Sequence, residues 1–377
     1  MPIEKCRVCE QNDLTLLAFF ENMPINLWPT LDANEETEFF NLEAYCCKSC
    51  SHIQLQNMNF DFISKLYSKP YLNMESESIN MKRIEYLRKD NNFYDAKILD
   101  VGGGTNPSYQ LLNNSMFTII DPQAPAVFQN TKVSYEIGYI SDVKLKSHYF
   151  DFIFAFHIIE HLENPKKDLS KLVKSMKLSG KLIIEVPDRL YYSKYMPFYM
   201  YFHQHISLFN LFTLDFLCES VGLHRTDSKI DEGRLLAIYE VSDFKNSEDS
   251  LTLLEPSVLD VNPSFFMNLD KMICDKIEQF QANNVIFVGA GGSTTLLLYH
   301  CPNLRRKINK LYDSDPRKIG LVLPGTNLVI EKTPAEVDSN STYVSFGCNV
   351  FKDISNFDDI VKIDVLDAIK ELRLNAK

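Results

Sequence analysis

The chain has 377 residues, of which 45% are hydrophobic and 24% are charged, so its composition is that of a globular protein. This length exceeds a single ordinary core and predicts two or three domains. The formal net charge of -11 and the pI of about 5.3 disfavour nucleic acid or an anionic membrane as the main partner, because those surfaces require clustered Lys and Arg. Small-molecule chemistry is favoured instead.

Targeting segments and disulfides are also not expected. No apolar run approaches the ~18 residues that a membrane-spanning helix needs, and the N-terminus lacks a basic segment followed by an apolar one. We therefore expect a cytoplasmic protein with no membrane partner. Five of the nine cysteines lie in the first fifty residues. The other four stand in apolar contexts and are expected to be buried thiols: Cys218, Cys274, Cys301 and Cys348.

The N-terminal cysteines form two C-x-x-C pairs, Cys6 with Cys9 and Cys47 with Cys50, and leave Cys46 over. Two such knuckles place four thiolates at the corners of a tetrahedron, which predicts bound Zn²⁺. Because four thiolates leave no coordination position for water, the zinc is expected to be structural and to stabilise a small N-terminal lobe. A redox pair or chance clustering are the alternative interpretations.

After the second knuckle, the run C-S-H-I-Q-L-Q predicts a strand, and residues 79–88 predict a helix that leads into the next domain. That domain is organised around residues 97–105, K-I-L-D-V-G-G-G-T. An apolar run that contains Asp100 and then three glycines predicts a buried parallel strand that turns at once into a helix. The glycines let the backbone approach a cofactor closely, so we take these four residues as cofactor-binding: Asp100, Gly102, Gly103 and Gly104.

Two further strands supply polar residues at their carboxyl ends. The run F-T-I-I-D ends in Asp121, a carboxylate that can accept two ribose hydroxyls. The run F-D-F-I-F-A-F is followed by His157, which we assign to the cofactor site, by Glu160 and His161, and by a helix from Pro165. The run S-G-K-L-I-I-E-V-P then predicts a fifth strand.

This order of strands, glycines and acids resembles the class I S-adenosylmethionine-dependent methyltransferases over roughly residues 90–240. The alternative is a dehydrogenase-type dinucleotide fold, and the segment I-I-E-H-L favours a methyltransferase. The order C-x-x-C, C-x-x-C-x-x-x-Q-L and Y-x-x-x-Y ahead of this core is similar to the zinc-containing, three-domain sugar C-methyltransferases. That family alkylates nucleotide-linked keto-deoxysugars.

The C-terminal third agrees with this resemblance. A Ser-, Glu- and Asp-rich run at 245–250 predicts a linker, followed by a helix over 263–281 and a second strand-turn-helix unit with glycines at 289–292. We interpret this unit as a degenerate Rossmann-like lobe and not as a second NAD site, because no acid at the usual distance is expected to end a strand. The family's D-x-x-P-x-K-x-G-x-x-L-P-G-T segment matches residues 313–326, and the resemblance implies that the lobe helps hold the nucleotide. Family members often carry a lysine in the glycine turn, which this chain lacks.

The resemblance also implies catalytic residues. In Y-F-H-Q-H, the family's Tyr-His-Glu-His becomes Phe202, His203, Gln204 and His205. His161 falls at a histidine of the family's catalytic face, and Tyr71 falls in the lobe's tyrosine motif; both join His203, Gln204 and His205 as catalytic candidates. C-methylation beside a ketone needs a base and donors for the enolate. We expect His205 to be the base, with His161 as the alternative, because imidazole accepts protons near neutral pH.

The predicted fold is therefore α/β, with a class I methyltransferase Rossmann-like core, an N-terminal zinc-binding lobe and a C-terminal Rossmann-like domain. The expected boundaries are 1–85, 86–245 and 246–377. Three functions compete: C-methylation of a nucleotide-linked sugar, O- or N-methylation of a sugar or related small molecule, and non-catalytic binding of a sugar nucleotide. The intact glycines and Asp121 argue against the third.

Overall fold

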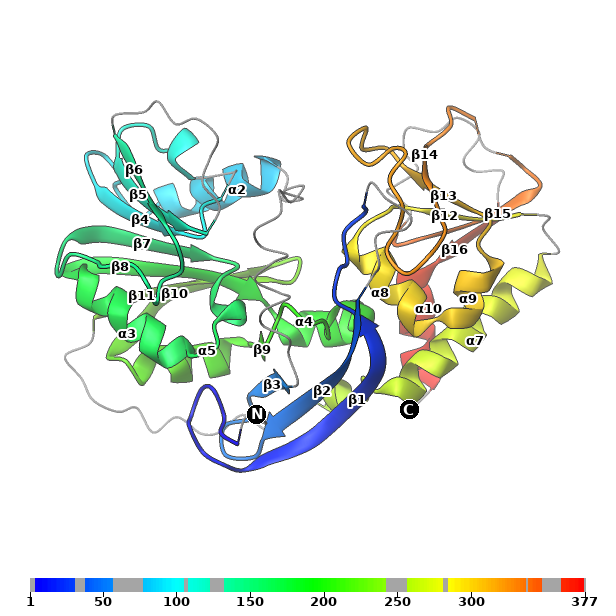
Figure 1. Cartoon of the computed structure of the whole chain (residues 1–377), viewed down its shortest axis with the longest axis horizontal. Helices are drawn as coiled ribbons and strands as arrows, with labels where there is room; N and C mark the ends of the chain where they lie inside the picture. Colours follow the sequence, from blue (N-terminus) through cyan, green and yellow to red (C-terminus); the bar gives the residue numbers. More distant parts are fainter. Residues whose placement is uncertain are drawn as a thin grey trace.

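The computed structural model describes residues 4–30, 38–56, 77–104, 108–122, 132–241, 256–280, 284–336, 338–347 and 361–375. These residues form three β-sheets with helices around two of them (Figure 1). Tyr71, Cys348 and the predicted linker at 245–250 lie outside the described residues. Among the helices that the structure describes, none is both long enough and apolar enough to cross a membrane.

The central sheet has seven strands in the order β10-β11-β8-β7-β4-β5-β6. Neighbours from β8 to β6 pair in parallel, whereas β11 pairs antiparallel with both β8 and β10. The strands are β4 (Lys97–Val101), β5 (Met116–Asp121), β6 (Val133–Ile137), β7 (Phe150–Phe156), β8 (Met176–Pro187), β10 (Leu223–Asp231) and β11 (Arg234–Val241). Since the strand order reverses between β4 and β7, a ligand is expected outside the carboxyl ends of these two strands.

Helices cover both faces of this sheet. On one face α3 (Pro165–Ser175) and α5 (Leu211–Glu219) bury leucines against the strands, and on the other face α2 (Glu77–Arg88) does the same (Figure 1). The expected boundary between residues 85 and 86 falls inside α2. The predicted helix directly after the glycine turn is wrong, because Ser108–Gln110 forms only a 3-10 helix, η1. Fourteen residues separate β4 from β5, and at the start of η1 the Ser108 amide is bound by the Asp100 carboxylate.

The N-terminal sheet has the order β1-β2-β3-β9, with antiparallel neighbours. Its strands are β1 (Leu14–Pro24), β2 (Phe39–Cys47), β3 (Ile53–Gln56) and β9 (Ser207–Leu208). The last strand begins two residues after His205, so the sheet is completed by a segment that was expected to belong to the central domain. Beside it lie α4 (Arg189–Tyr195), η2 (Ile159–His161) and η3 (Pro197–Tyr199).

The C-terminal sheet is fully parallel, in the order β14-β13-β12-β15-β16. Its strands are β12 (Asn284–Val288), β13 (Lys310–Asp313), β14 (Ile330–Lys332), β15 (Ser341–Ser345) and β16 (Val361–Asp364). Its helices are α6 (Pro256–Leu259), α7 (Pro263–Gln279), α8 (Gly292–His300), α9 (Pro302–Lys307) and α10 (Val365–Asn375). One apolar core joins this domain to the N-terminal sheet: Phe20 and Met23 of β1 share it with Phe266 of α7 and Leu297 of α8.

Candidate active site and metal centre

The glycine turn after β4 is shaped by close packing. Gly102 has a φ of 72°, and a Cβ at this position would lie 2.0 Å from Cδ1 of Ile158. Only glycine therefore fits without displacing the segment that follows β7. Asp100 is buried, and its Oδ2 accepts a hydrogen bond from the Ser108 amide at 3.2 Å. Burial raises the pKa of Asp100 to about 6. Asp100 therefore stabilises the conformation of the turn.

Asp121 ends β5 directly beside that turn. Its Oδ2 accepts a hydrogen bond from the Gly104 amide at 2.9 Å, and the Tyr135 hydroxyl donates to the Gly104 carbonyl at 3.2 Å. The carboxylate thus holds the turn as well as lying at the edge where a ligand is expected. The predicted cofactor residues from β4 and β5 are brought together by these contacts.

His157, at the carboxyl end of β7, lies between two buried carboxylates. Its Nε2 is 3.1 Å from Glu185 Oε1 and its Nδ1 is 3.3 Å from Glu160 Oε1. Burial opposes the charged imidazole, but the contacts with Glu160 and Glu185 outweigh it and raise the pKa of His157 to about 10. The backbone φ of 54° is the left-handed conformation, which is uncommon for histidine and is often found at functional sites.

Arg83 of α2 anchors the other side of Glu185. Its Nη2 and Nε donate to the two Glu185 oxygens at 2.5 and 3.1 Å, and the guanidinium lies 4.4 Å from the centre of the Phe156 ring. Burial would raise the pKa of Glu185, but hydrogen bonds from His157 and Arg83 lower it to about 2. Arg83, Glu185, His157 and Glu160 therefore form one row of alternating positive and negative groups at the carboxyl edge of the sheet.

Glu160, His161 and His205 form a second group at the end of this row. One ligating atom from each lies within 4.8 Å of the others. His161 Nδ1 is 2.6 Å from the backbone carbonyl of Gln204, and the rings of His161 and His205 lie 4.9 Å apart, edge to face. Desolvation lowers the pKa of His205 well below its usual range, and the nearby His161 and His157 lower it further.

The other catalytic candidates lie differently. His203 is fully buried, its Nε2 is 3.3 Å from the Met23 carbonyl of β1, and burial lowers its pKa to about 4. It packs between the N-terminal sheet and the central domain instead of joining His161 and His205. Phe202 forms an apolar wall, with its ring centre 4.0 Å from that of His205. Gln204 is buried and places its carbonyl against His161.

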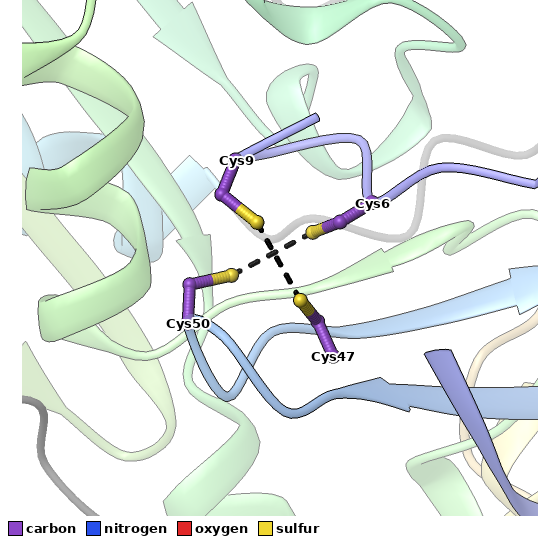
Figure 2. Close-up of side chains that lie close together, drawn as sticks. All are labelled: Cys6, Cys9, Cys47 and Cys50. Atoms are coloured by element: carbon purple, nitrogen blue, oxygen red, sulfur yellow. Dashed lines mark hydrogen bonds between the residues drawn. The ribbon is translucent and has the colours of Figure 1, made fainter. Parts of the chain in front are cut away.

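The four predicted zinc ligands lie together, with their sulfurs pointing to one centre (Figure 2). The Sγ atoms of Cys6 and Cys50 are 3.6 Å apart, and those of Cys9 and Cys47 are 3.5 Å apart. A zinc tetrahedron with ~2.3 Å Zn–S bonds has edges of about 3.8 Å, so these separations fit the ion. Cys46 instead contributes its side chain to the core shared with the C-terminal domain.

Two buried arginines flank this cysteine group. Arg7 is 7% exposed and donates from Nη1 to the carbonyls of Leu55 and Ile206, while its Nε and Nη2 have no hydrogen-bond partner. Arg189 is 3% exposed and donates to the Ser51 carbonyl, with its Nε unpartnered. Buried guanidinium nitrogens without a hydrogen-bond partner are costly, and a divalent ion held by four thiolates carries a net charge of -2 that would attract both arginines.

The second glycine turn, at the end of β12, has its own acid. Asp313 ends β13, and its Oδ2 accepts hydrogen bonds from the Ala290 amide at 2.7 Å and from Lys318 Nζ at 2.8 Å. The expectation that no acid ends a strand at this distance is therefore wrong, because the short apolar run K-L-Y-D does form a strand. Gly292 lies against Trp28 and Leu27 of the N-terminal segment.

The row formed by Arg83, Glu185, His157 and Glu160 was not predicted from the sequence. Glu185 was visible as a lone acid inside an apolar strand, which is an unusual position for an unpaired charge. Arg83 carried no signal, because its pairing with Glu185 spans 102 residues of chain. Glu160 was seen at the end of its strand but was not assigned a role.

Comparisons with known proteins identify the type of the central domain. Residues 74–226 match the model of a methyltransferase domain family. An uncharacterized protein of Methanocaldococcus jannaschii is 27% identical over 130 residues, which are 34% of this chain and 62% of that protein. The chain thus spans about three fifths of the length of the curated relative it matches.

Solved structures show a partial likeness at low identity. A Burkholderia thailandensis 1,6-didemethyltoxoflavin-N1-methyltransferase is 15% identical with a TM-score of 0.38, covering 49% of this chain and 87% of that one. An S-adenosylmethionine-dependent methyltransferase from Aquifex aeolicus is 15% identical with a TM-score of 0.36, covering 48% and 96%. The domain assignment rests on the family match and not on these two structures.

The chain therefore carries a class I S-adenosylmethionine-dependent methyltransferase domain with an α/β, Rossmann-like fold. The enzyme class and the core fold predicted from the sequence are confirmed for this domain, whose central sheet has the reversal of strand order between β4 and β7.

Proposed function

We propose that the whole protein is a methyltransferase that transfers the methyl group of S-adenosylmethionine to a small molecule, with a nucleotide-linked deoxysugar as the substrate class. One observation carries this proposal. Gly102 of the cofactor turn packs directly against Ile158, which lies between His157 and the group of Glu160, His161 and His205. The cofactor turn and the polar group therefore meet at the edge where the strand order reverses.

The cofactor is held, in this proposal, by the turn at Gly102–Gly104 and by Asp121. The glycines admit the ligand close to the backbone, and the Asp121 carboxylate accepts hydrogen bonds from ribose hydroxyls. Asp100 supports the cofactor site by holding the glycine turn through the Ser108 amide, and His157 supports it through its ion pair with Glu160. When bound, S-adenosylmethionine supplies the electrophilic methyl group, and the chain's residues position the acceptor in line with it.

The acceptor is activated at the histidine pair. His205 is the group that we propose accepts its proton, with His161 as the alternative, because His205 stands at the histidine position of the resembling family and its ring centre lies 4.9 Å from that of His161. By resemblance the reaction is C-methylation beside a ketone. Gln204 and Phe202 stand where the family has an acid and a tyrosine, and these two changes favour O- or N-methylation as the second candidate function.

Cys6, Cys9, Cys47 and Cys50 are proposed to hold one structural Zn²⁺. The sulfur separations and the two buried arginines with unpartnered guanidinium nitrogens support this assignment. Arg7 also links the site to catalysis, because it follows Cys6 and donates to the carbonyl of Ile206, the residue after His205. The metal is thus proposed to fix the loop that carries His205. The three-domain division at 1–85, 86–245 and 246–377, with the last domain facing the nucleotide, is part of the same proposal.

Calorimetry with the purified full-length chain tests the cofactor. We expect binding of S-adenosylmethionine and of S-adenosylhomocysteine, and no binding of NAD or NADP. A preference for NAD would overturn the proposed function, whatever acceptor the protein then used.

A further inference from the structure

The group of Glu160, His161 and His205 has the composition of a metal site. It offers one carboxylate oxygen and two imidazole nitrogens, and these atoms lie within 4.8 Å of one another at the end of β7 and just before β9. Two histidines with one carboxylate, leaving positions open, are a common ligand set for first-row divalent cations in enzymes.

The Glu160 carboxylate is short of donors. The residue is 1% exposed, and neither of its oxygens receives a hydrogen bond; the closest cation is His157, with Nδ1 3.3 Å from Oε1. A buried acceptor without a hydrogen bond costs about 1–3 kcal/mol, and more when it is charged. The charge of His157 offsets part of this cost, and a cation bound to the carboxylate would offset the rest.

His161 is oriented as metal-binding histidines are. Its Nδ1 lies 2.6 Å from the Gln204 carbonyl, which can only accept, so Nδ1 donates this hydrogen bond. Its Nε2 faces the Glu160 carboxylate, 3.9 Å from Oε1. A backbone carbonyl that fixes the tautomer in this way is the usual outer support of a histidine ligand.

We propose that Glu160, His161 and His205 bind a divalent first-row transition-metal cation. A tetrahedral ion with ~2.0–2.1 Å bonds separates its ligand atoms by about 3.4 Å, so Glu160 and His161 need to approach by roughly half an ångström. His157 contacts Glu160 from outside the site, and Glu185, which is itself paired with Arg83, contacts His157. Nitrogen ligands exclude Mg²⁺ and Ca²⁺ as the preferred ions, because both favour all-oxygen sites.

Three protein ligands leave room for an oxygen of the acceptor. The site adjoins Ile158 and through it the cofactor turn, so such an oxygen lies on the side where methyl transfer is proposed. This inference rests on the proposed function for the location of the site. It competes with the base role of His205, because one imidazole lone pair cannot bind a metal ion and a proton together. A measurement of metal binding therefore distinguishes the role of His205 as a metal ligand from its role as the base.

The test uses the full-length chain loaded with one equivalent of Zn²⁺ to fill the cysteine site, and then titrated with Co²⁺. We expect one further Co²⁺ per chain, with visible absorption but without the thiolate charge-transfer bands that cobalt at the cysteines would show. Glu160→Gln and His161→Ala remove a ligand, and each should weaken Co²⁺ binding by more than the ~10–100-fold that loss of an outer support costs. The exposed His224 of β10 gives the matched control, because His224→Ala should bind Co²⁺ like the wild type.

Circular dichroism and titration with S-adenosylhomocysteine accompany each variant. A folded wild type that binds S-adenosylhomocysteine but takes up no second cation at millimolar Co²⁺ overturns this inference and leaves the proposed function intact. The same holds if Glu160→Gln and His161→Ala bind Co²⁺ as tightly as the wild type. Absence of S-adenosylhomocysteine binding would instead overturn the proposed function.

Discussion

Replacing Asp121 with alanine tests the cofactor site through a side chain with two tasks. The Asp121 carboxylate holds the Gly104 amide at 2.9 Å and is proposed to accept hydrogen bonds from the cofactor's ribose. A hydrogen bond to a charged group contributes about 1.5–3 kcal/mol. Loss of a single ribose contact therefore predicts binding of S-adenosylmethionine that is weaker by roughly 10- to 150-fold, since 1.4 kcal/mol corresponds to tenfold.

The second task predicts a separate loss of stability. Without its partner in Asp121→Ala, the Gly104 amide loses a charge-assisted hydrogen bond, so the free energy of unfolding should fall by about 1.5–3 kcal/mol. Asp121→Asn keeps an oxygen for that amide and should recover part of both losses. The exposed Asp90 after α2 supplies the control, and Asp90→Ala should change neither quantity.

Isothermal titration calorimetry measures the affinity, and urea denaturation followed by circular dichroism measures the stability. Asp121→Ala with wild-type affinity for both S-adenosylmethionine and S-adenosylhomocysteine would refute the assignment of this carboxylate to the ribose. Lost affinity with unchanged stability would instead show that the contact with Gly104 contributes nothing measurable.

Four further predictions concern other parts of the molecule. Metal analysis of the purified chain should find zinc at the cysteine site. Cys9→Ser should lower the zinc content and the melting temperature more than it lowers cofactor affinity, whereas a zinc-free protein of full stability would contradict this assignment. Arg83→Met removes one of the two cations that contact Glu185 and should lower the free energy of unfolding by about 1.5–3 kcal/mol in urea denaturation. The pKa of Glu185 near 2 means that the pair stabilises the fold above pH 4.5 and that this stability is lost as the pH falls from 4.5 toward 2, a loss that Arg83→Met should move to higher pH. His205→Ala should lower turnover by ~10²–10⁴ with nearly unchanged cofactor affinity, and wild-type turnover would remove it from the mechanism. Gln204→Glu should preserve the rate of a C-methyltransferase and impair an O- or N-methyltransferase.

The central domain could be predicted from the sequence because its signals are local. The parallel strands β4, β5 and β7 are short apolar runs, and polar or glycine residues follow or end them at the cofactor edge, as Gly102 after β4 and Asp121 at the end of β5 show. The cysteine spacing is equally local, because each knuckle lies within four residues. Such features depend on neighbours in the chain and are readable before any tertiary contact is known.

The features that escaped prediction depend on contacts between distant residues. Arg83 meets Glu185 across 102 residues, and the pairing of β3 with β9 joins residues 53–54 to 207–208. The fully buried place of His203 depends on the Met23 carbonyl, which belongs to another sheet. No periodicity or motif in the sequence indicates these contacts, so the different environments of the histidines could be known only from the structure.

Methyl transfer itself tests the central claim most directly. The full-length protein is incubated with S-adenosylmethionine carrying a trideuterated methyl group and with a panel of nucleotide-linked keto-deoxysugars, and products are followed by mass spectrometry and located by NMR. We predict one product in which a trideuteromethyl group replaces a hydrogen, together with S-adenosylhomocysteine in equal amount. With His205→Ala both should form ~10²–10⁴-fold more slowly. Formation of no labelled product from any acceptor, by a folded protein that also fails to bind S-adenosylhomocysteine, would contradict the account.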